Sequence, residues 1–170
     1  MKIKLSDIKL GFQNKSFDVL AEDIPNKGVI YKDDLVRCML SSIKLKENCF
    51  NLIGKIETTL QYECVRCLNV YKSKKSIPIN ILLDNQPSLN KYDYEKEIID
   101  IKSIKNELNL ASYISDIIAL SKPMKSLCNY KCEGICFICG LNKNKISCKC
   151  KHNKNSGTWD KLKTLDIKKY

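Results

Sequence analysis

The sequence predicts an α+β fold, namely a curled antiparallel sheet or partial β-barrel with packing helices and a cysteine-rich C-terminal segment. Three observations lead to this prediction. Apolar and polar residues alternate along much of the first half of the chain, as in half-buried strands. A stripe of apolar residues with helical spacing follows. Six of the ten cysteines then lie within residues 128–150, in the pattern C-x3-C-x3-C-x2-C-x8-C-x-C.

The clearest strand pattern covers residues 50–64, where even-numbered positions are mostly apolar and odd-numbered positions are largely polar. Such alternation places one face of a strand on a core. Since this is long for one strand, we expect a bulge or bend at Gly54 that lets the strand curl. Cys38 and Cys49 lie inside strand patterns and are expected to be buried apolar side chains. Further strands are expected at 2–5, 16–20, 35–46, 77–83 and 98–101.

A helix is expected near residues 109–121. Asn109 is a suitable N-cap, and Pro123 ends the helix and turns the chain toward the cysteines. One apolar stripe follows the helical period and should pack on the sheet; it consists of Leu110, Tyr113, Ile114, Ile117 and Ile118. A last amphipathic helix is expected over residues 159–168. We therefore expect a β-rich domain at 1–122, a cysteine-rich segment at 123–155 and a C-terminal helix at 156–170.

The cysteines indicate zinc. With C-x2-C at Cys64 and Cys67, eight sulfurs are grouped closely enough to close two four-thiolate sites. Disulfides are the main alternative. The opening MKIKLSDIKL has no apolar signal region, and no stretch of about 18 apolar residues is present. We therefore expect a cytoplasmic protein with no membrane partner, and in a reducing compartment clustered cysteines are more often metal ligands than disulfides.

The expected ligand sets follow from spacing. Cys136-x2-Cys139 has the form of a zinc knuckle, in which Gly140 permits a tight turn. Its nearest partners are Cys148 and Cys150, which can reach one metal only if the chain turns between them; His152 is the alternative ligand. The other expected site takes the remaining four of the eight cysteines, which are Cys64, Cys67, Cys128 and Cys132.

The charge suggests a polyanionic partner. The chain carries a formal charge of +11, and from residue 125 onward eleven Lys face three acidic residues. RNA or DNA would fit this excess. The chain has 28 Lys and only two Arg, so the lysines could equally reflect the base composition of the gene and lie in solvent. The candidate nucleic-acid contacts are Lys143, Lys145, Lys149, Lys151 and Lys154.

No catalytic arrangement is visible in the sequence. There is no phosphate-binding glycine loop and no G-x-S-x-G turn, and the single histidine offers little for Cys–His or Ser–His catalysis. We therefore expect no enzyme and no small-molecule substrate. A redox role for Cys64 and Cys67 is a third alternative, although that motif normally lies between a strand and a helix.

The sequence resembles the YceD family, the large ribosomal RNA subunit accumulation proteins. The resemblance rests on ECVRCL at 63–68, LSKPMKSLC at 120–128, CEGICFICGLN at 132–142, the cysteines at 148 and 150, and WDKLKTL at 159–165. Members usually carry Asp-Pro-Arg ahead of the final helix, where this sequence has Ser156-Gly157-Thr158.

The resemblance implies a bacterial or organellar, non-enzymatic ribosome-biogenesis factor. Such a factor supports accumulation or processing of large-subunit ribosomal RNA, with that RNA or ribosomal proteins as partners. The alternative function is a zinc-ribbon protein-interaction module, for example one that contacts the transcription machinery.

Overall fold

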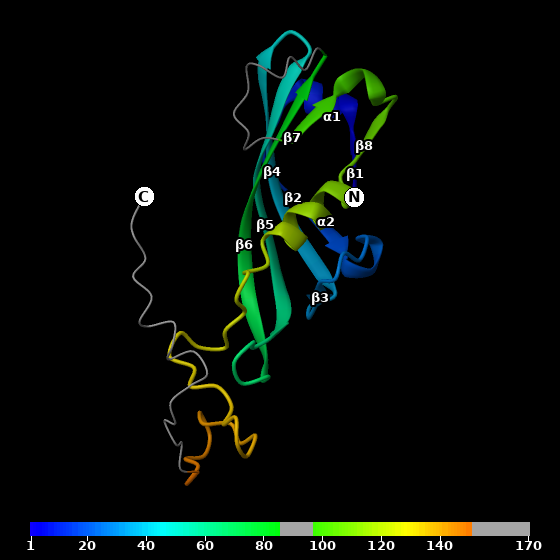
Figure 1. Ribbon diagram of the computed structural model, residues 1–170. Helices are drawn as coiled ribbons and strands as arrows, with labels where there is room; N and C mark the ends of the chain where they lie inside the picture. Colours follow the sequence, from blue (N-terminus) through cyan, green and yellow to red (C-terminus); the bar gives the residue numbers. More distant parts are fainter. Residues whose placement is uncertain (86–96, 151–170) are drawn as a thin grey trace, which may run out of the picture.

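A computed structural model describes residues 1–85 and 97–150 of the chain (Figure 1). These residues form a mostly-β structure with two short α-helices, α1 (Leu5–Leu10) and α2 (Ala111–Leu120). Two short 3-10 helices are η1 (Ala21–Asp23) and η2 (Ile101–Ser103). The strands are β1 (Lys2–Lys4), β2 (Phe12–Leu20), β3 (Ile30–Tyr31), β4 (Leu35–Lys46), β5 (Cys49–Glu63), β6 (Val70–Asp84), β7 (Glu97–Asp100) and β8 (Glu107–Asn109).

The main sheet has the strand order β2-β4-β5-β6-β7, and β3 pairs with β5 as well. All of its pairs are antiparallel except β6 with β7, which are parallel. Strands β5 and β6 stay in register from the Phe50–Leu83 pair to the Glu63–Val70 pair, which makes them one long hairpin. Strands β1 and β8 form a separate two-stranded sheet.

The predicted curling is wrong, because the sheet is mixed and neither curled nor closed; β2 and β7 stand at opposite ends of its strand order. The predicted bulge at Gly54 is also wrong. Gly54 pairs with Leu40 on one side and Ile79 on the other in unbroken register. A Cβ atom at this position would lie 1.9 Å from the carbonyl oxygen of Met39. Glycine is needed here because the backbone of β4 approaches closely, and β5 continues through this position without a bulge.

One face of the sheet carries the core. Helix α2 packs on it, as Figure 1 shows, and the predicted stripe is confirmed because Leu110, Ile114 and Ile118 have no exposed surface. The predicted N-cap is displaced by one residue: the N-cap is Leu110, and Asn109 precedes it, its Oδ1 accepting a hydrogen bond from the Ala111 N–H at 3.1 Å. The helix ends at Leu120. The expected helix over residues 159–168 lies outside the described residues.

Cys38 and Cys49 are buried in the sheet, as predicted. Burial raises the pKa of Cys38 to about 11, so its thiol stays protonated and behaves as a small apolar group.

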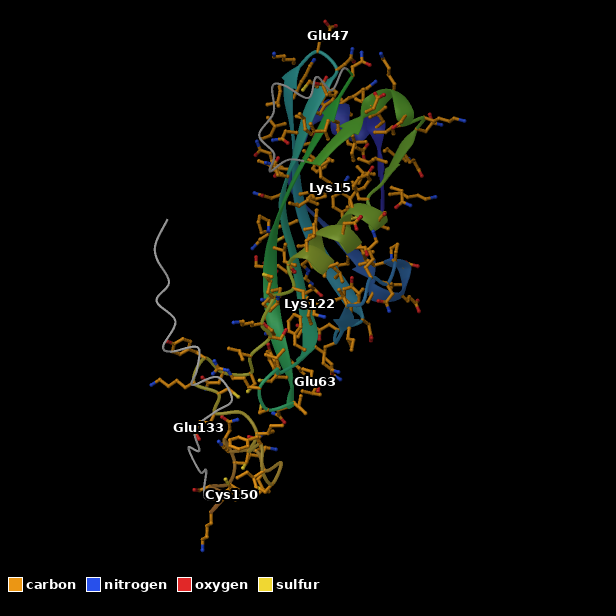
Figure 2. All side chains as sticks on the ribbon, viewed as in Figure 1. Lys15, Glu47, Glu63, Lys122, Glu133 and Cys150 are labelled. Carbon is orange, nitrogen blue, oxygen red and sulfur yellow. The ribbon has the colours of Figure 1, made fainter. Side chains whose placement is uncertain are left out.

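The long β5–β6 hairpin sets the shape of the molecule. Glu47, in the turn between β4 and β5, and Cys150 lie at opposite ends (Figure 2). The turn between β5 and β6 extends beyond α2, and the chain that leaves α2 returns to this turn (Figure 1). The cysteine-rich segment is therefore attached to the tip of the hairpin, away from the core.

Candidate metal centres

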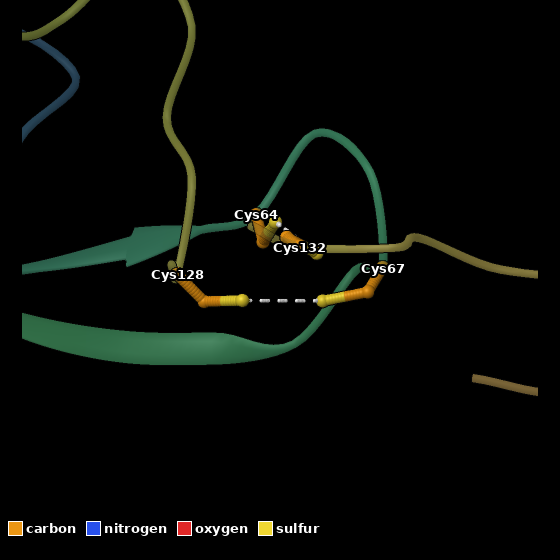
Figure 3. Close-up of side chains that lie close together, drawn as sticks. All are labelled: Cys64, Cys67, Cys128 and Cys132. Atoms are coloured by element: carbon orange, nitrogen blue, oxygen red, sulfur yellow. Dashed lines mark hydrogen bonds between the residues drawn. The ribbon is translucent and has the colours of Figure 1, made fainter. Parts of the chain in front are cut away.

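The first group of thiols, here called the front centre, joins two distant parts of the chain. Cys64 and Cys67 lie in the turn between β5 and β6, whereas Cys128 and Cys132 follow α2 (Figure 3). All four Sγ atoms lie within 4.8 Å of one another. The Cys64 and Cys132 sulfurs are 3.7 Å apart, and the Cys67 and Cys128 sulfurs are 3.5 Å apart. Three of these cysteines are buried, and Tyr71 packs against them.

The second group, the rear centre, lies in one short stretch of chain. It consists of Cys136, Cys139, Cys148 and Cys150, whose Sγ atoms also lie within 4.8 Å of one another. Residues 147–150 form no strand, so Cys148 and Cys150 are able to reach the same point. Cys136 is buried while Cys139 is exposed. The structure thus brings the eight cysteines together in the two predicted sets of four, and His152 lies outside the described residues.

The two C-x2-C turns have the same construction. The N–H of Leu68 donates to the Cys64 carbonyl at 2.9 Å, and the N–H of Gly140 donates to the Cys136 carbonyl at 2.8 Å. Both donors have positive φ, 58° at Leu68 and 72° at Gly140. Such a turn aims backbone N–H groups at the first sulfur, as the knuckle pattern predicts.

These N–H groups act on the first thiol of each pair. Burial acts to raise the pKa of Cys64, but hydrogen bonds from the backbone of Cys128, Cys67 and Arg66 lower it below the ordinary value. The pKa of Cys136 is lowered in the same way, first by the backbone N–H groups of Cys139 and Ile138. The first thiol of each turn therefore ionises to the thiolate more readily than an ordinary cysteine.

In each centre, the pKa of one other thiol shifts in the opposite direction. A hydrogen bond to the Cys67 sulfur raises the pKa of Cys128, and burial adds to the effect. A hydrogen bond to the Cys139 sulfur and burial likewise raise the pKa of Cys150. Four sulfurs this close together cannot all carry a negative charge unless a cation offsets it.

The donor set fits such a cation. A tetrahedral zinc site with Zn–S bonds of about 2.3 Å places its sulfurs about 3.8 Å apart, close to the 3.7 and 3.5 Å separations of the front centre. All ten cysteines are free, so the short separations are not disulfides. Cys64 and Cys67 also lie in a hairpin turn rather than between a strand and a helix, which is not the setting of a redox C-x2-C motif. Each cluster could thus bind one metal ion.

Sequence reasoning missed two residues that contact the front centre. Arg66 Nη1 donates to the Cys132 carbonyl at 2.9 Å, and Asn144 Nδ2 lies 3.3 Å from the Cys132 sulfur. No sequence signal identifies Asn144 as a neighbour of a sulfur that lies twelve residues away, because the contact depends on the fold of the rear segment.

The predicted lysines are only partly described. Lys145 and Lys149 are exposed and Lys143 is half-buried, while Lys151 and Lys154 lie outside the described residues. Residues 125–150 carry five Lys and one Glu. Two filled four-thiolate zinc sites would contribute about −4, which leaves this segment close to neutral. With both sites filled, the positive charge of the C-terminal part would reside mainly beyond residue 150.

Fold and site together define a mostly-β protein with two four-cysteine clusters that could each hold a metal ion. Residues 52–166 match the family model described as Large ribosomal RNA subunit accumulation protein YceD. The chain belongs to the YceD family, which confirms the resemblance. This membership implies a role in accumulation of large-subunit ribosomal RNA, and the family is not known as an enzyme family. No curated protein and no solved structure matches the chain.

Among the described residues, none of the helices has the length and apolar character needed to cross a membrane.

Proposed function

We propose that the protein is a non-enzymatic, cytoplasmic ribosome-biogenesis factor that supports accumulation or processing of large-subunit ribosomal RNA. Its cysteine-rich end binds that RNA or a ribosomal protein. The observation that carries this proposal is the position of the two clusters, which lie at the tip of the long hairpin and away from the core (Figure 1). A β-rich unit at 1–122 would act as the support, and the segment at 123–155 as the contacting part.

Zinc is the metal that we propose for both centres, because closed four-thiolate sites are its usual structural environment. The ion would cross-link the chain and would take part in no reaction. The residues of the chain do the rest: the two C-x2-C turns place their sulfurs, and the backbone N–H groups favour the thiolate form. The segment that follows α2 has little regular structure of its own, so its shape would depend on these cross-links.

RNA contact would use the lysines around and beyond the rear centre. The test is a binding titration of the full chain with large-subunit ribosomal RNA fragments at several salt concentrations. If about six phosphates are contacted, the affinity should fall roughly a thousandfold between about 50 and 200 mM salt. Neutralising the five candidate lysines should reduce the steepness of the plot of log affinity against log salt by about four. The variant replaces five lysines by Gln: Lys143, Lys145, Lys149, Lys151 and Lys154.

A matched control removes the same charge from elsewhere. Its five lysines are exposed, form none of the described ion pairs and belong to the sheet domain; they are Lys9, Lys44, Lys46, Lys102 and Lys105. This control should keep most of the affinity. If both variants lose the same fraction of the RNA affinity, the net charge of the protein determines binding and the position of the lysines does not. If neither variant loses RNA binding, the lysine interface is refuted.

A second candidate function is protein binding by a zinc-ribbon module. It is favoured by apolar side chains exposed on both sides of the front centre, among them Val65 at 59%, Leu68 at 58% and Tyr130 at 86%. The near-neutral charge that residues 125–150 would have with both zinc sites filled points the same way. Capture of a ribosomal protein that survives ribonuclease treatment, and is lost in Leu68→Ser with Tyr130→Ser, would favour this function over RNA binding.

A further inference from the structure

Cys132 and Cys136 belong to different centres although only three residues separate them. Between them the chain enters a small hairpin whose tip is the rear C-x2-C turn. The Cys136 N–H donates to the Leu141 carbonyl at 2.8 Å, and the Lys143 N–H donates to the Gly134 carbonyl at 2.9 Å. Ile135 and Asn142 form the bridge between the two arms. A metal in the rear centre would hold this hairpin closed, because both Cys136 and Cys139 lie at its tip.

Closing the hairpin places Asn144 beside the front centre. Asn144 Oδ1 accepts a hydrogen bond from the Glu133 N–H at 2.9 Å. Its Nδ2 lies 3.3 Å from the Cys132 sulfur and 2.8 Å from the Asn142 Oδ1. This network fixes the orientation of the amide, since the flipped amide would turn its oxygen toward the sulfur and its NH2 toward an N–H donor.

The base of the hairpin is also braced against the front C-x2-C turn. The Ile135 N–H donates to the Arg66 carbonyl at 3.1 Å, and Arg66 Nη1 donates to the Cys132 carbonyl at 2.9 Å. Gly134 has a φ of +77°, and a Cβ atom there would lie 3.0 Å from the Arg66 carbonyl oxygen. The hairpin and the front turn are therefore packed backbone to backbone.

We propose that Asn144 couples the two metal centres, so that metal in the rear centre strengthens metal binding in the front centre. This inference rests on the proposed metal binding. The rear metal closes the hairpin, the hairpin positions Asn144, and the Asn144 amide donates to the Cys132 thiolate. Hydrogen bonds to a metal ligand are worth about ten- to a hundredfold in affinity. Because coupling is reciprocal, metal in the front centre strengthens binding in the rear centre by the same factor.

The test is a chelator competition on the full chain loaded with cadmium and followed by cadmium NMR, in which the two centres give separate signals. Cys67→Ser and Cys139→Ser assign the signals, because each variant removes a ligand from one centre. The front affinity is then measured in the wild type, in Asn144→Ala, in Cys139→Ser and in the double variant. Each single change should weaken the front centre by about tenfold, and the double variant should be no weaker than either one.

A matched control is Asn129→Ala. Asn129 lies in the same segment and its Oδ1 accepts from the Lys131 N–H at 3.0 Å, but it donates to no sulfur among the described contacts. Its front affinity should stay near the wild-type value. Asn144→Asp keeps the acceptor for Glu133 but places an oxygen against the thiolate, so it should weaken the front centre at least as much as Asn144→Ala.

The outcomes separate the coupling from the metal binding itself. If both centres fill and Asn144→Ala leaves the front affinity unchanged, the coupling is overturned while the metal centres stand. If the losses in Asn144→Ala and Cys139→Ser multiply in the double variant, the two act independently and the coupling is again overturned. A chain that takes up no metal overturns both proposals.

Discussion

Replacing Gly54 by Ala should destabilise the sheet strongly. The added Cβ would lie 1.9 Å from the Met39 carbonyl oxygen and 2.9 Å from its carbonyl carbon, whereas contacts under 3.0 Å are essentially not tolerated. Both atoms belong to the backbone of β4, which cannot rotate out of the way as a side chain would. The strand must therefore move by more than 1 Å, at the centre of the β4–β5 register.

The expected cost is about 3 kcal/mol, the upper part of the range for overpacked positions. Restriction of the unfolded chain by alanine offsets roughly 0.4–1 kcal/mol of it. The free energy of unfolding is measured by denaturant titration. Gly28→Ala is the control, since nothing lies within 4 Å of its Cβ and only its positive φ of 75° is unfavourable. That control should cost about 1 kcal/mol. A loss at Gly54 no larger than the loss at Gly28 would refute the steric argument.

The remaining predictions concern the helix and the clusters. Purified protein should contain two metal ions, and Cys139→Ser should release one of them while the front centre stays filled, as measured by metal analysis; loss of both would contradict separate centres. Asn109→Ala should lower the free energy of unfolding by about 1 kcal/mol, because the hydrogen bond that its side chain accepts from the first residue of α2 is lost. Gly140→Leu should weaken metal binding in the rear centre about tenfold, because a leucine is strained in the left-handed backbone conformation. Leu68→Gly should change metal binding in the front centre by less than about threefold, because the relief of backbone strain and the added entropy of the unfolded chain offset each other. In metal-free native protein, iodoacetamide followed by mass spectrometry should modify exposed Cys139 well before Cys38, whose pKa burial raises to about 11.

The sequence predicted elements well where the pattern was local. The β4 strand has the predicted bounds of 35–46; its burial alternates over residues 35–42, and residues 43–46 are exposed. The β6 strand begins at Val70, earlier than the predicted 77, since lysines on both faces of residues 70–76 hide the alternation. Its pairing with β5 holds that part of β6 in the sheet. The short α1 helix and the parallel position of β7 have no periodic signal, so they could not be foreseen.

The grouping of the cysteines could be predicted for a simple reason. Each C-x2-C turn offers two ligands and needs two more. Apart from Cys38 and Cys49 inside strands, the chain has only two further pairs of cysteines, and the pair at 148 and 150 lies nearest the rear turn. Asn144 could not be predicted, because its neighbour Cys132 is brought to it by the hairpin at the rear centre and by the brace at Arg66. When two segments that are distant in sequence come together in the fold, the spacing of residues within either segment does not reveal the contact.

The front centre has a consequence for folding, because its two halves are far apart in sequence. Cys67 and Cys128 are 61 positions apart, and the intervening chain contains β6, β7, β8 and α2. If a metal cross-link there behaves as a covalent one does, closing so long a loop removes about 4 kcal/mol of conformational freedom from the unfolded chain. The rear centre closes a loop only a quarter as long. Metal binding at the hairpin tip would thus stabilise the whole sheet, and loss of the metal would lower the stability of the sheet as well as that of the C-terminal end.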